Sequence, residues 1–183
     1  MRRKSHQHLG RYLADNYMSH LPGHYVRVFL IGCVEPDLNP VTYLKGSLRF
    51  QWLRGHNYCN ARRFMRQISR RLEKKRQLRL FDYYTLGKLI HYTADAFTLA
   101  HNDFFPSRLA YHREYEEALQ EHFLQYLRED PEIDPVTAAT VMDAIYQYHR
   151  QYEHQHGTIA TDARFTLNIC CCVVALLITR QIL

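Results

Sequence analysis

Apolar residues recur at helical spacing along most of the chain, and short breaks that contain proline or glycine separate the apolar segments. The spacing predicts helices over about 5–18, 60–80, 86–102, 108–128, 134–156 and from about 161 onward. Ser5 is a good N-cap for the first of these helices. The stretch 26–34 is almost entirely apolar and could form a buried helix or a strand. We therefore expect an all-α fold, a compact multi-helix bundle, in one domain over 1–183.

Prolines add two local predictions. Pro36 and Pro40 bracket a segment that we expect to be a rigid turn, and this turn would hold Asp37 close to the core because it follows the buried stretch. The dipeptide Asp134-Pro135 is typical of a helix start, with the aspartate as cap and the proline in the first turn.

The segment 86–102 carries three residues of metal-ligand type. His91 and Asp95 are four apart and therefore project from one side of a helix. His101 follows His91 by ten residues, which in a continuous helix places it about 15 Å further along the axis. One ion cannot take both histidines unless the helix breaks, whereas two neighbouring ions could, with Asp95 between them. A single pair of this kind is more often a cap or a surface pair.

A second such pair is His112 and Glu116, again four residues apart. An ordinary helical ion pair of Glu116 with Arg113 is the alternative. His56 follows a glycine just ahead of the helix 60–80, where its side chain could point toward a central site.

Other histidines give no metal signal by themselves. His6 lies in the first turn of the first helix, and exposure is its simplest interpretation. His149, His154 and His156 lie near the polar end of the helix 134–156, where we expect them to be solvated.

The chain has 183 residues and a net charge of +6, which allows anionic partners without selecting one. The helix 60–80 is the most basic segment. It could be a solvated face or could attach the protein to an anionic membrane surface or a phosphate-bearing substrate. Its basic residues are Arg62, Arg63, Arg66, Arg70, Arg71, Lys74, Lys75, Arg76 and Arg79.

The basic N-terminal segment is not followed by an apolar run, so we expect no secretory signal and a cytoplasmic protein, peripheral at the membrane if the basic helix docks there. The five cysteines show neither disulfide nor zinc-finger spacing, and reduced thiols are expected. The apolar run 169–178 is too short to span a bilayer of about 30 Å, so it predicts a buried core helix. Its adjacent Cys170, Cys171 and Cys172 could be lipid-modified, but buried thiols are more common.

Taken together, these residues and the sequence around them resemble the zinc-dependent phospholipase C family. The matching segments are SH near the N-terminus, EPD after the apolar run, GHNY, LGKLIHYTADAFTLAHN and HREYE. The family pattern of His-x-x-x-Asp, five residues and then His is present at His91, Asp95 and His101, and the later His-x-x-x-Glu pair at His112 and Glu116. The fungal single-strand nucleases belong to the same superfamily.

The resemblance implies a helical bundle around a cleft that holds two to three zinc ions. Nitrogen and oxygen ligands without thiolate suit zinc, with manganese or iron as alternatives. On the family mapping, the first ion takes Asp37, His56, His91 and Asp95, the second takes His101, His112 and Glu116, and the third takes His6 with the shared Asp95.

The chain departs from the family pattern in two places. In the secreted enzymes the N-terminal tryptophan helps to hold the third zinc, whereas here Met1 precedes His6 by five residues, so a weak or differently completed third site is expected. Leu38 and Leu53 stand where the choline-specific enzymes have aromatic residues, so choline specificity is not expected.

The resulting hypothesis is metal-assisted hydrolysis of a phosphodiester, with Asp37 as the general base. The expected substrate is a phospholipid or another phosphate ester, and no stable nucleic-acid partner is expected. A nuclease or nucleotidase of the same superfamily and a non-catalytic protein stabilised by zinc are the alternatives. An HD-type phosphohydrolase is disfavoured, because no adjacent His-Asp pair occurs in the sequence.

Overall fold

The structure is a computed structural model of the chain. It describes residues 1–39, 57–102, 109–134, 137–155 and 158–178. Every regular element within these ranges is a helix, which confirms the all-α prediction. The elements are α1 (Arg3–Tyr17), α2 (Gly23–Leu38), α3 (Tyr58–Glu73), α4 (Leu80–Ala96), the 3-10 helix η2 (Leu99–His101), α5 (Leu109–Arg128), α6 (Val141–Gln155) and α7 (Ile159–Ile178).

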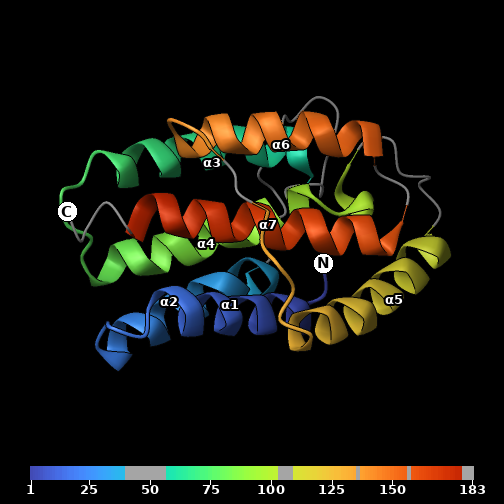
Figure 1. Cartoon of the computed structure of the whole chain (residues 1–183), viewed down its shortest axis with the longest axis horizontal. Coiled ribbons are helices and arrows are strands. Elements are labelled where there is room, and N and C mark those ends of the chain that lie inside the picture. Colours follow the sequence, from blue (N-terminus) through green and yellow to red (C-terminus); the bar gives the residue numbers. More distant parts are fainter. Residues whose placement is uncertain (40–56, 103–108, 135–136, 156–157, 179–183) are drawn as a thin grey trace.

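The helix α7 runs through the middle of the bundle, with α1 and α2 along one side and α3 and α6 along the other (Figure 1). It packs against α1, α4, α5 and α6. By length and apolar composition α7 could cross a membrane, but most of it is buried inside the protein, as in the core helix of a globular bundle. Cys170, Cys171 and Cys172 are buried within it as free thiols, as the sequence predicted for a core helix.

The closest helix pair is α2 and α4, which meet backbone to backbone at two glycines. A Cβ atom on Gly32 would lie 2.1 Å from the carbonyl oxygen of Tyr84, and one on Gly87 would lie 2.2 Å from that of Phe29. No other residue type fits at either position without separating the helices. This contact sets the distance between two helices that carry predicted site residues.

The structure corrects the expected turn after the apolar stretch. The stretch 26–34 is helical within α2, and α2 continues through Pro36 to Leu38. Asp37 therefore lies in the last helical turn and not in a proline-bracketed turn. Pro40 lies outside the described residues.

Two predicted helix starts are also wrong. Ser5 is not a cap, because α1 already begins at Arg3 and Ser5 is buried within it. Asp134 does not start a helix, and α6 begins at Val141 after Thr140, whose Oγ1 accepts a hydrogen bond from the backbone N–H of Asp143 at 3.1 Å. Before α6 the sequence offers several capping residues, Asp134, Thr137 and Thr140, whereas α1 has Arg2 at its N-cap without a side-chain hydrogen bond.

The basic helix is shorter than predicted and strongly amphipathic. The helix α3 ends at Glu73. Its start is capped by Asn57, whose side chain accepts from the backbone N–H of Cys59 at 3.0 Å. Met65, Ile68 and Leu72 are buried on its inner face.

Candidate metal centre

The helix α4 ends at Ala96, and this break brings His101 into the site. The predicted continuous helix to Asn102 is wrong, because the chain turns at Thr98 and continues as η2. As a result, His101 Nε2 lies 3.9 Å from Asp95 Oδ1. The 15 Å separation expected for a continuous helix therefore does not apply, and both histidines of this segment face one carboxylate.

Asp95 is fully buried and is the common neighbour of the cluster. Its Oδ1 lies 3.2 Å from His6 Nε2, and its Oδ2 lies 3.3 Å from His91 Nε2. Burial raises the pKa of Asp95, but the interactions with His101 and with the amino group of Met1 outweigh burial and hold it well below its usual range. The carboxylate is therefore ionised and faces several nitrogen atoms at once.

The orientation of His91 is set by a backbone carbonyl. His91 Nδ1 lies 2.9 Å from the carbonyl oxygen of Cys33. A carbonyl oxygen only accepts, so Nδ1 carries the hydrogen and donates it. In the neutral ring Nε2 is then the unprotonated nitrogen, and it points toward Asp95 and toward Asp37 Oδ1 at 3.6 Å. The glycine contact between α2 and α4 places the Cys33 carbonyl within reach.

His6 is buried at 1% exposure, so the interpretation of an exposed terminal histidine is wrong. Its ring stacks on that of His91 with centroids 3.9 Å apart. Burial, followed by the neighbouring His91, lowers the pKa of His6 to about 4, so the ring is neutral near pH 7. Neither ring nitrogen makes a hydrogen bond of acceptable geometry within the described part of the chain.

Thr98 orients the ring of His101, as the Cys33 carbonyl orients that of His91. Its hydroxyl donates to the carbonyl oxygen of Asp95 at 2.9 Å and lies 2.9 Å from His101 Nδ1. Because the hydroxyl hydrogen is used by the carbonyl, Nδ1 of His101 donates to the hydroxyl oxygen. In the neutral ring, Nε2 of His101 is then the unprotonated nitrogen, on the side of Asp95.

His112 and Glu116 on α5 form a second part of the cluster. His112 Nε2 lies 3.6 Å from Glu116 Oε1. Burial raises the pKa of Glu116, but the hydrogen bond from His112 and the charge of the Met1 amino group lower it to about 2. The sequence analysis gave an ion pair of Glu116 with Arg113 as the alternative. In the structure Arg113 pairs with Glu117 instead, at 3.5 Å.

The amino nitrogen of Met1 links these two parts. It donates to Asp95 Oδ1 at 2.6 Å and lies 3.6 Å from Glu116 Oε1. It also lies 3.4 Å from His101 Nδ1, which is too long to compete with Thr98 for that atom. The sequence analysis expected a weak or differently completed third site because Met1 precedes His6 by five residues. In the structure α1 begins at Arg3, so the first residue lies little more than one helical turn from His6.

The structure thus gathers seven of the eight residues predicted from the sequence into one chain of contacts. The eighth, His56, lies outside the described residues. Within the described part, His6, His91 and Asp95 have ligand atoms that all lie within 4.8 Å of one another. The gathered residues are His6, Asp37, His91, Asp95, His101, His112 and Glu116.

A family model described as zinc-dependent phospholipase C matches residues 5–159. The chain belongs to the zinc-dependent phospholipase C family. The resemblance carried by the motifs is confirmed, and the matched range covers α1 from Ser5 onward, all of α2 to α6, and the first residue of α7. Comparisons with curated proteins and with solved structures returned no match.

The donor geometry fits the metal that the family name implies. Zinc bonds of about 2.0–2.2 Å in a tetrahedron place neighbouring ligand atoms roughly 3.3–3.6 Å apart. The contacts of Asp95 with His6 and His91 are 3.2 and 3.3 Å, and His91 lies 3.6 Å from Asp37. A bound cation would also satisfy the unprotonated nitrogen of His6, and neither ring nitrogen has a hydrogen bond within the described residues.

A buried polar network beneath η2 was not predicted from the sequence. Asp162, in the first turn of α7, accepts from the backbone N–H of Leu99 at 2.9 Å and from the Tyr152 hydroxyl at 2.8 Å. The Tyr115 hydroxyl donates to the same carboxylate and accepts from the Leu99 N–H at 3.0 Å. The network holds the turn that carries His101. An aspartate at the start of an apolar segment was the only sequence signal for it.

His149 belongs to this inner layer, so the prediction that it is solvated is wrong. Its Nε2 donates to Asn102 Oδ1 at 3.0 Å, because the Asn102 amide already donates to the carbonyl oxygens of Ala96 and Thr98. Its ring stacks on Tyr58, with centroids 3.6 Å apart. Burial lowers the pKa of His149 to about 4. The imidazole therefore braces the end of α4 in its neutral form.

His154 is exposed, as expected, and His156 lies outside the described residues.

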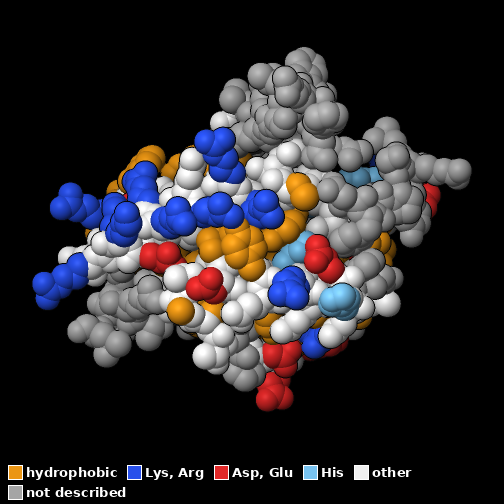
Figure 2. Space-filling view, turned by 90° about the horizontal axis from the view of Figure 1, so that it is seen from above, with side chains coloured by type: hydrophobic (Ala, Val, Ile, Leu, Met, Phe, Trp, Pro, Cys, Tyr) orange, Lys and Arg blue, Asp and Glu red, His pale blue; other side chains and the backbone are white. Residues whose placement is uncertain are grey.

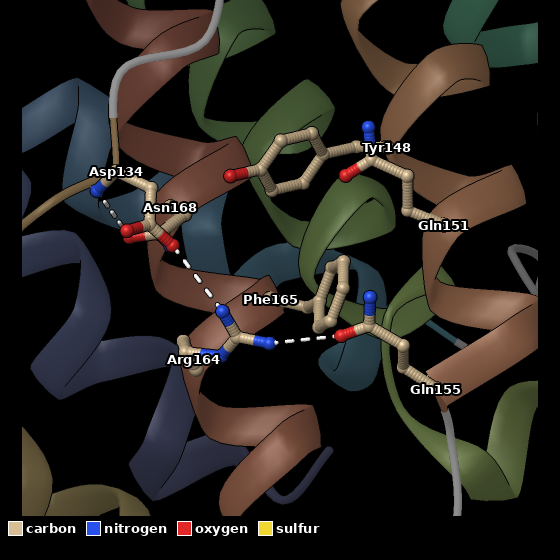
Figure 3. Close-up of a pocket in the computed structure, with 7 residues that line it drawn as sticks. All are labelled: Asp134, Tyr148, Gln151, Gln155, Arg164, Phe165 and Asn168. Carbon is tan, nitrogen blue, oxygen red and sulfur yellow. Dashed lines mark hydrogen bonds and ion pairs between the residues drawn. The ribbon is translucent and has the colours of Figure 1, made fainter.

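A separate pocket of about 280 Å³ lies where α6 and α7 meet the segment before α6 (Figure 3). Its polar groups pair with one another: Asp134 Oδ2 accepts from Asn168 at 2.6 Å and lies 3.4 Å from Arg164. Arg164 also donates to Gln155 at 3.1 Å. The pocket shares no residue with the cluster around Asp95. Its lining residues are Asp134, Tyr148, Gln151, Gln155, Arg164, Phe165 and Asn168.

Proposed function

We propose that the chain is a zinc-dependent phosphodiester hydrolase of the phospholipase C type. The observation that carries the proposal is the buried Asp95 carboxylate, which faces His6, His91 and His101, while the nitrogen atoms of His6 have no hydrogen bond within the described residues. A buried carboxylate surrounded by several imidazole rings is a costly arrangement in a structural core and is typical of a metal site. Bound zinc would polarise the phosphoryl oxygens and lower the pKa of a bound water.

The assignment of ligands to ions follows the family resemblance, and the contacts within the cluster support it. Asp37, His91 and Asp95 face one another and would hold one ion together with His56. His101, His112 and Glu116 would hold a second. His6 and Asp95 would contribute to a third, and the Met1 amino nitrogen lies beside the same carboxylate oxygen. The neutral state of His6 and the ionised states of Asp95 and Glu116 are those that metal ligation requires.

Asp37 is the general base of the proposed reaction. It lies at the C-terminal end of α2, partly exposed, with Oδ1 3.6 Å from His91 Nε2. Its carboxylate is therefore beside the cluster and accessible to substrate at once. It would accept the proton of the attacking water, a role that contributes about 10²–10⁴-fold to the rate.

The proposed substrate is a phospholipid, as the family name suggests. Leu38, next to Asp37, is 58% exposed and offers no aromatic face to a quaternary ammonium group. A head group other than choline is therefore proposed. The basic surface of α3, together with the lack of a clear base-stacking motif in the sequence, favours lipid over nucleic acid as the substrate.

The test is hydrolysis of a soluble chromogenic phosphodiester by the full chain. Activity should be lost to a chelator and restored by zinc. Asp37→Asn should lose about 10²–10⁴-fold in rate, and its metal content must be measured on the same sample, because Asp37 is also a proposed ligand. Fully metallated protein that hydrolyses no phosphate ester would support the structural-zinc alternative. Cleavage of single-stranded DNA without action on phospholipid would assign the chain to the nuclease branch.

A further inference from the structure

The outer face of α3 and the segment that follows it form a continuous cationic surface. Figure 2 shows Lys and Arg side chains in a row across the face of the molecule that is seen from above. Residues 58–81 contain a single acidic residue, Glu73, and its carboxylate accepts from the backbone N–H of Val141 at 2.7 Å. The exposed cations are Arg62, Arg63, Arg66, Arg70, Arg71, Lys74, Arg76 and Arg79.

Two exposed apolar side chains follow this row directly. Leu80 is 41% exposed and Phe81 is 64% exposed, at the first turn of α4. Phe81 contacts Tyr84 with ring centroids 5.4 Å apart, which orients the ring without burying it. Leu78 is buried and anchors the loop from beneath. The exposed apolar pair therefore projects from a fixed position beside the cations.

Ion pairs with Asp82 fix the end of the cationic row to α4. Lys75 and Arg71 lie 2.5 and 3.4 Å from Asp82 Oδ1, and Asp82 is buried. These ion pairs tie the end of α3 to the start of α4. They make the cationic row and the apolar pair parts of one rigid surface.

We propose that this surface, the exposed cations between Arg62 and Arg79 together with Leu80 and Phe81, docks the protein on an anionic lipid bilayer. The cations face the lipid phosphates and carboxylates, and the apolar pair enters the boundary between head groups and acyl chains. The choice of lipid as the partner rests on the proposed function, but the docking itself does not need hydrolysis.

A bilayer fits this surface better than a nucleic acid does. Single-stranded nucleic acid is bound by aromatic side chains interleaved with cations, so that the bases stack between them. Here the only exposed large apolar residues near the cations are Leu80 and Phe81 at one end, within the described part of the chain. Surfaces that bind at the membrane interface show the same arrangement, with the cations in one area and the apolar side chains that enter the bilayer in another.

Docking at this end also has a geometric relation to the metal centre. Phe81 and His91 lie on the same helix, ten residues apart, which corresponds to about 15 Å along its axis. The first turn of α4 would thus contact the bilayer while the other half of the same helix carries the cluster. A lipid head group would then have to rise about 15 Å from the bilayer surface to reach the cluster around Asp95.

The test is co-sedimentation of the full chain with vesicles of phosphatidylcholine alone and of equal parts phosphatidylcholine and phosphatidylserine, in chelator to prevent hydrolysis. The protein should bind the anionic vesicles and be released by salt. The charge variant Arg70→Gln/Arg76→Gln should bind roughly 25-fold more weakly, about fivefold for each charge. The apolar variant Phe81→Ser should bind about tenfold more weakly.

Matched controls lie on other helices. Arg11→Gln/Arg27→Gln removes the same charge from exposed positions on α1 and α2, and Ile31→Ser removes an apolar side chain that is 54% exposed on α2. Both should bind the anionic vesicles like the unchanged chain. Equal losses in the controls, equal binding to both kinds of vesicle, or tighter binding to single-stranded DNA than to anionic vesicles would overturn the proposal.

The soluble phosphodiester assay separates this proposal from the proposed function. The docking variants should retain full activity on the soluble substrate. Vesicle binding without any phosphodiesterase activity would leave the docking surface standing and remove the enzymatic proposal. Phosphodiesterase activity without vesicle binding would do the opposite.

Discussion

The backbone N–H of Leu99 donates to the carboxylate of Asp162 at 2.9 Å, and Leu99 begins the single turn that ends at His101. The acceptor lies on α7 and is completely buried. A residue that follows the family-matched segment 5–159 thus supports a proposed metal ligand within it.

This relationship predicts the effect of Asp162→Asn. The change keeps the shape but removes the charge that accepts from Leu99 and from the Tyr115 and Tyr152 hydroxyls. The free energy of unfolding should fall by about 1–3 kcal/mol, and zinc affinity should fall about 10–100-fold, as for other residues that orient metal ligands. Denaturant unfolding and a competitive zinc titration measure the two effects. The exposed Asp15→Asn is the control, and unchanged zinc affinity in Asp162→Asn would contradict the positioning role.

The glycine contact between α2 and α4 predicts a strong effect of Gly32→Ala. The new Cβ would lie 2.1 Å from the Tyr84 carbonyl oxygen, a backbone atom that cannot move aside. Overpacking of this kind costs about 1–3 kcal/mol or more, and it should also weaken zinc binding by moving the Cys33 carbonyl away from His91. Gly23→Ala is the matched control, because nothing lies within 4 Å of its Cβ position. Similar melting temperatures for the two variants would rule out the close contact.

The shared position of Asp95 predicts an unequal effect of two ligand changes. Asp95→Asn removes a charge that several proposed ligands face, whereas His6→Ala removes one contact at the edge of the cluster. The total zinc bound at equilibrium should therefore fall more in Asp95→Asn, as measured by elemental analysis after dialysis. Equal losses would show that Asp95 is not shared between ions.

The metal-free protein should lose stability as the pH falls from about 6.5 to about 4. The pKa values of His6 and His149 are lowered to about 4 by burial, so the unfolded chain binds more protons than the folded chain within this window. Stability therefore rises with pH, by at most about 1.4 kcal/mol per pH unit for each histidine. Urea unfolding of the metal-free chain at a series of pH values measures this slope. His149→Gln should flatten it, and a slope unchanged by that substitution would contradict the buried neutral state.

Much of the site was predictable because its residues are tied to helical spacing. Pairs four residues apart, such as His112 and Glu116, keep their relation in any helix. The family motif supplied what spacing could not, namely that separate pairs converge.

The remainder depends on contacts between distant segments. The end of α4 at Ala96 is stabilised by Thr98, by Asp162 on α7 and by Tyr115 on α5, and no local signal near Ala96 marks it. Pro36 is tolerated inside α2, although its ring normally marks a helix boundary. The burial of His6 and His149 is likewise decided by the helices that cover them.

The hydrogen bond that orients His91 has a backbone carbonyl as its acceptor, so no side chain at position 33 takes part in it. The orientation of the imidazole therefore depends on Gly32 and Gly87, because their close contact places the Cys33 carbonyl beside His91. A survey of chemically reactive side chains would overlook both positions, although the packing of the site depends on them. Conversely, Cys33→Ala would leave the acceptor of the imidazole in place, because that acceptor is a backbone oxygen.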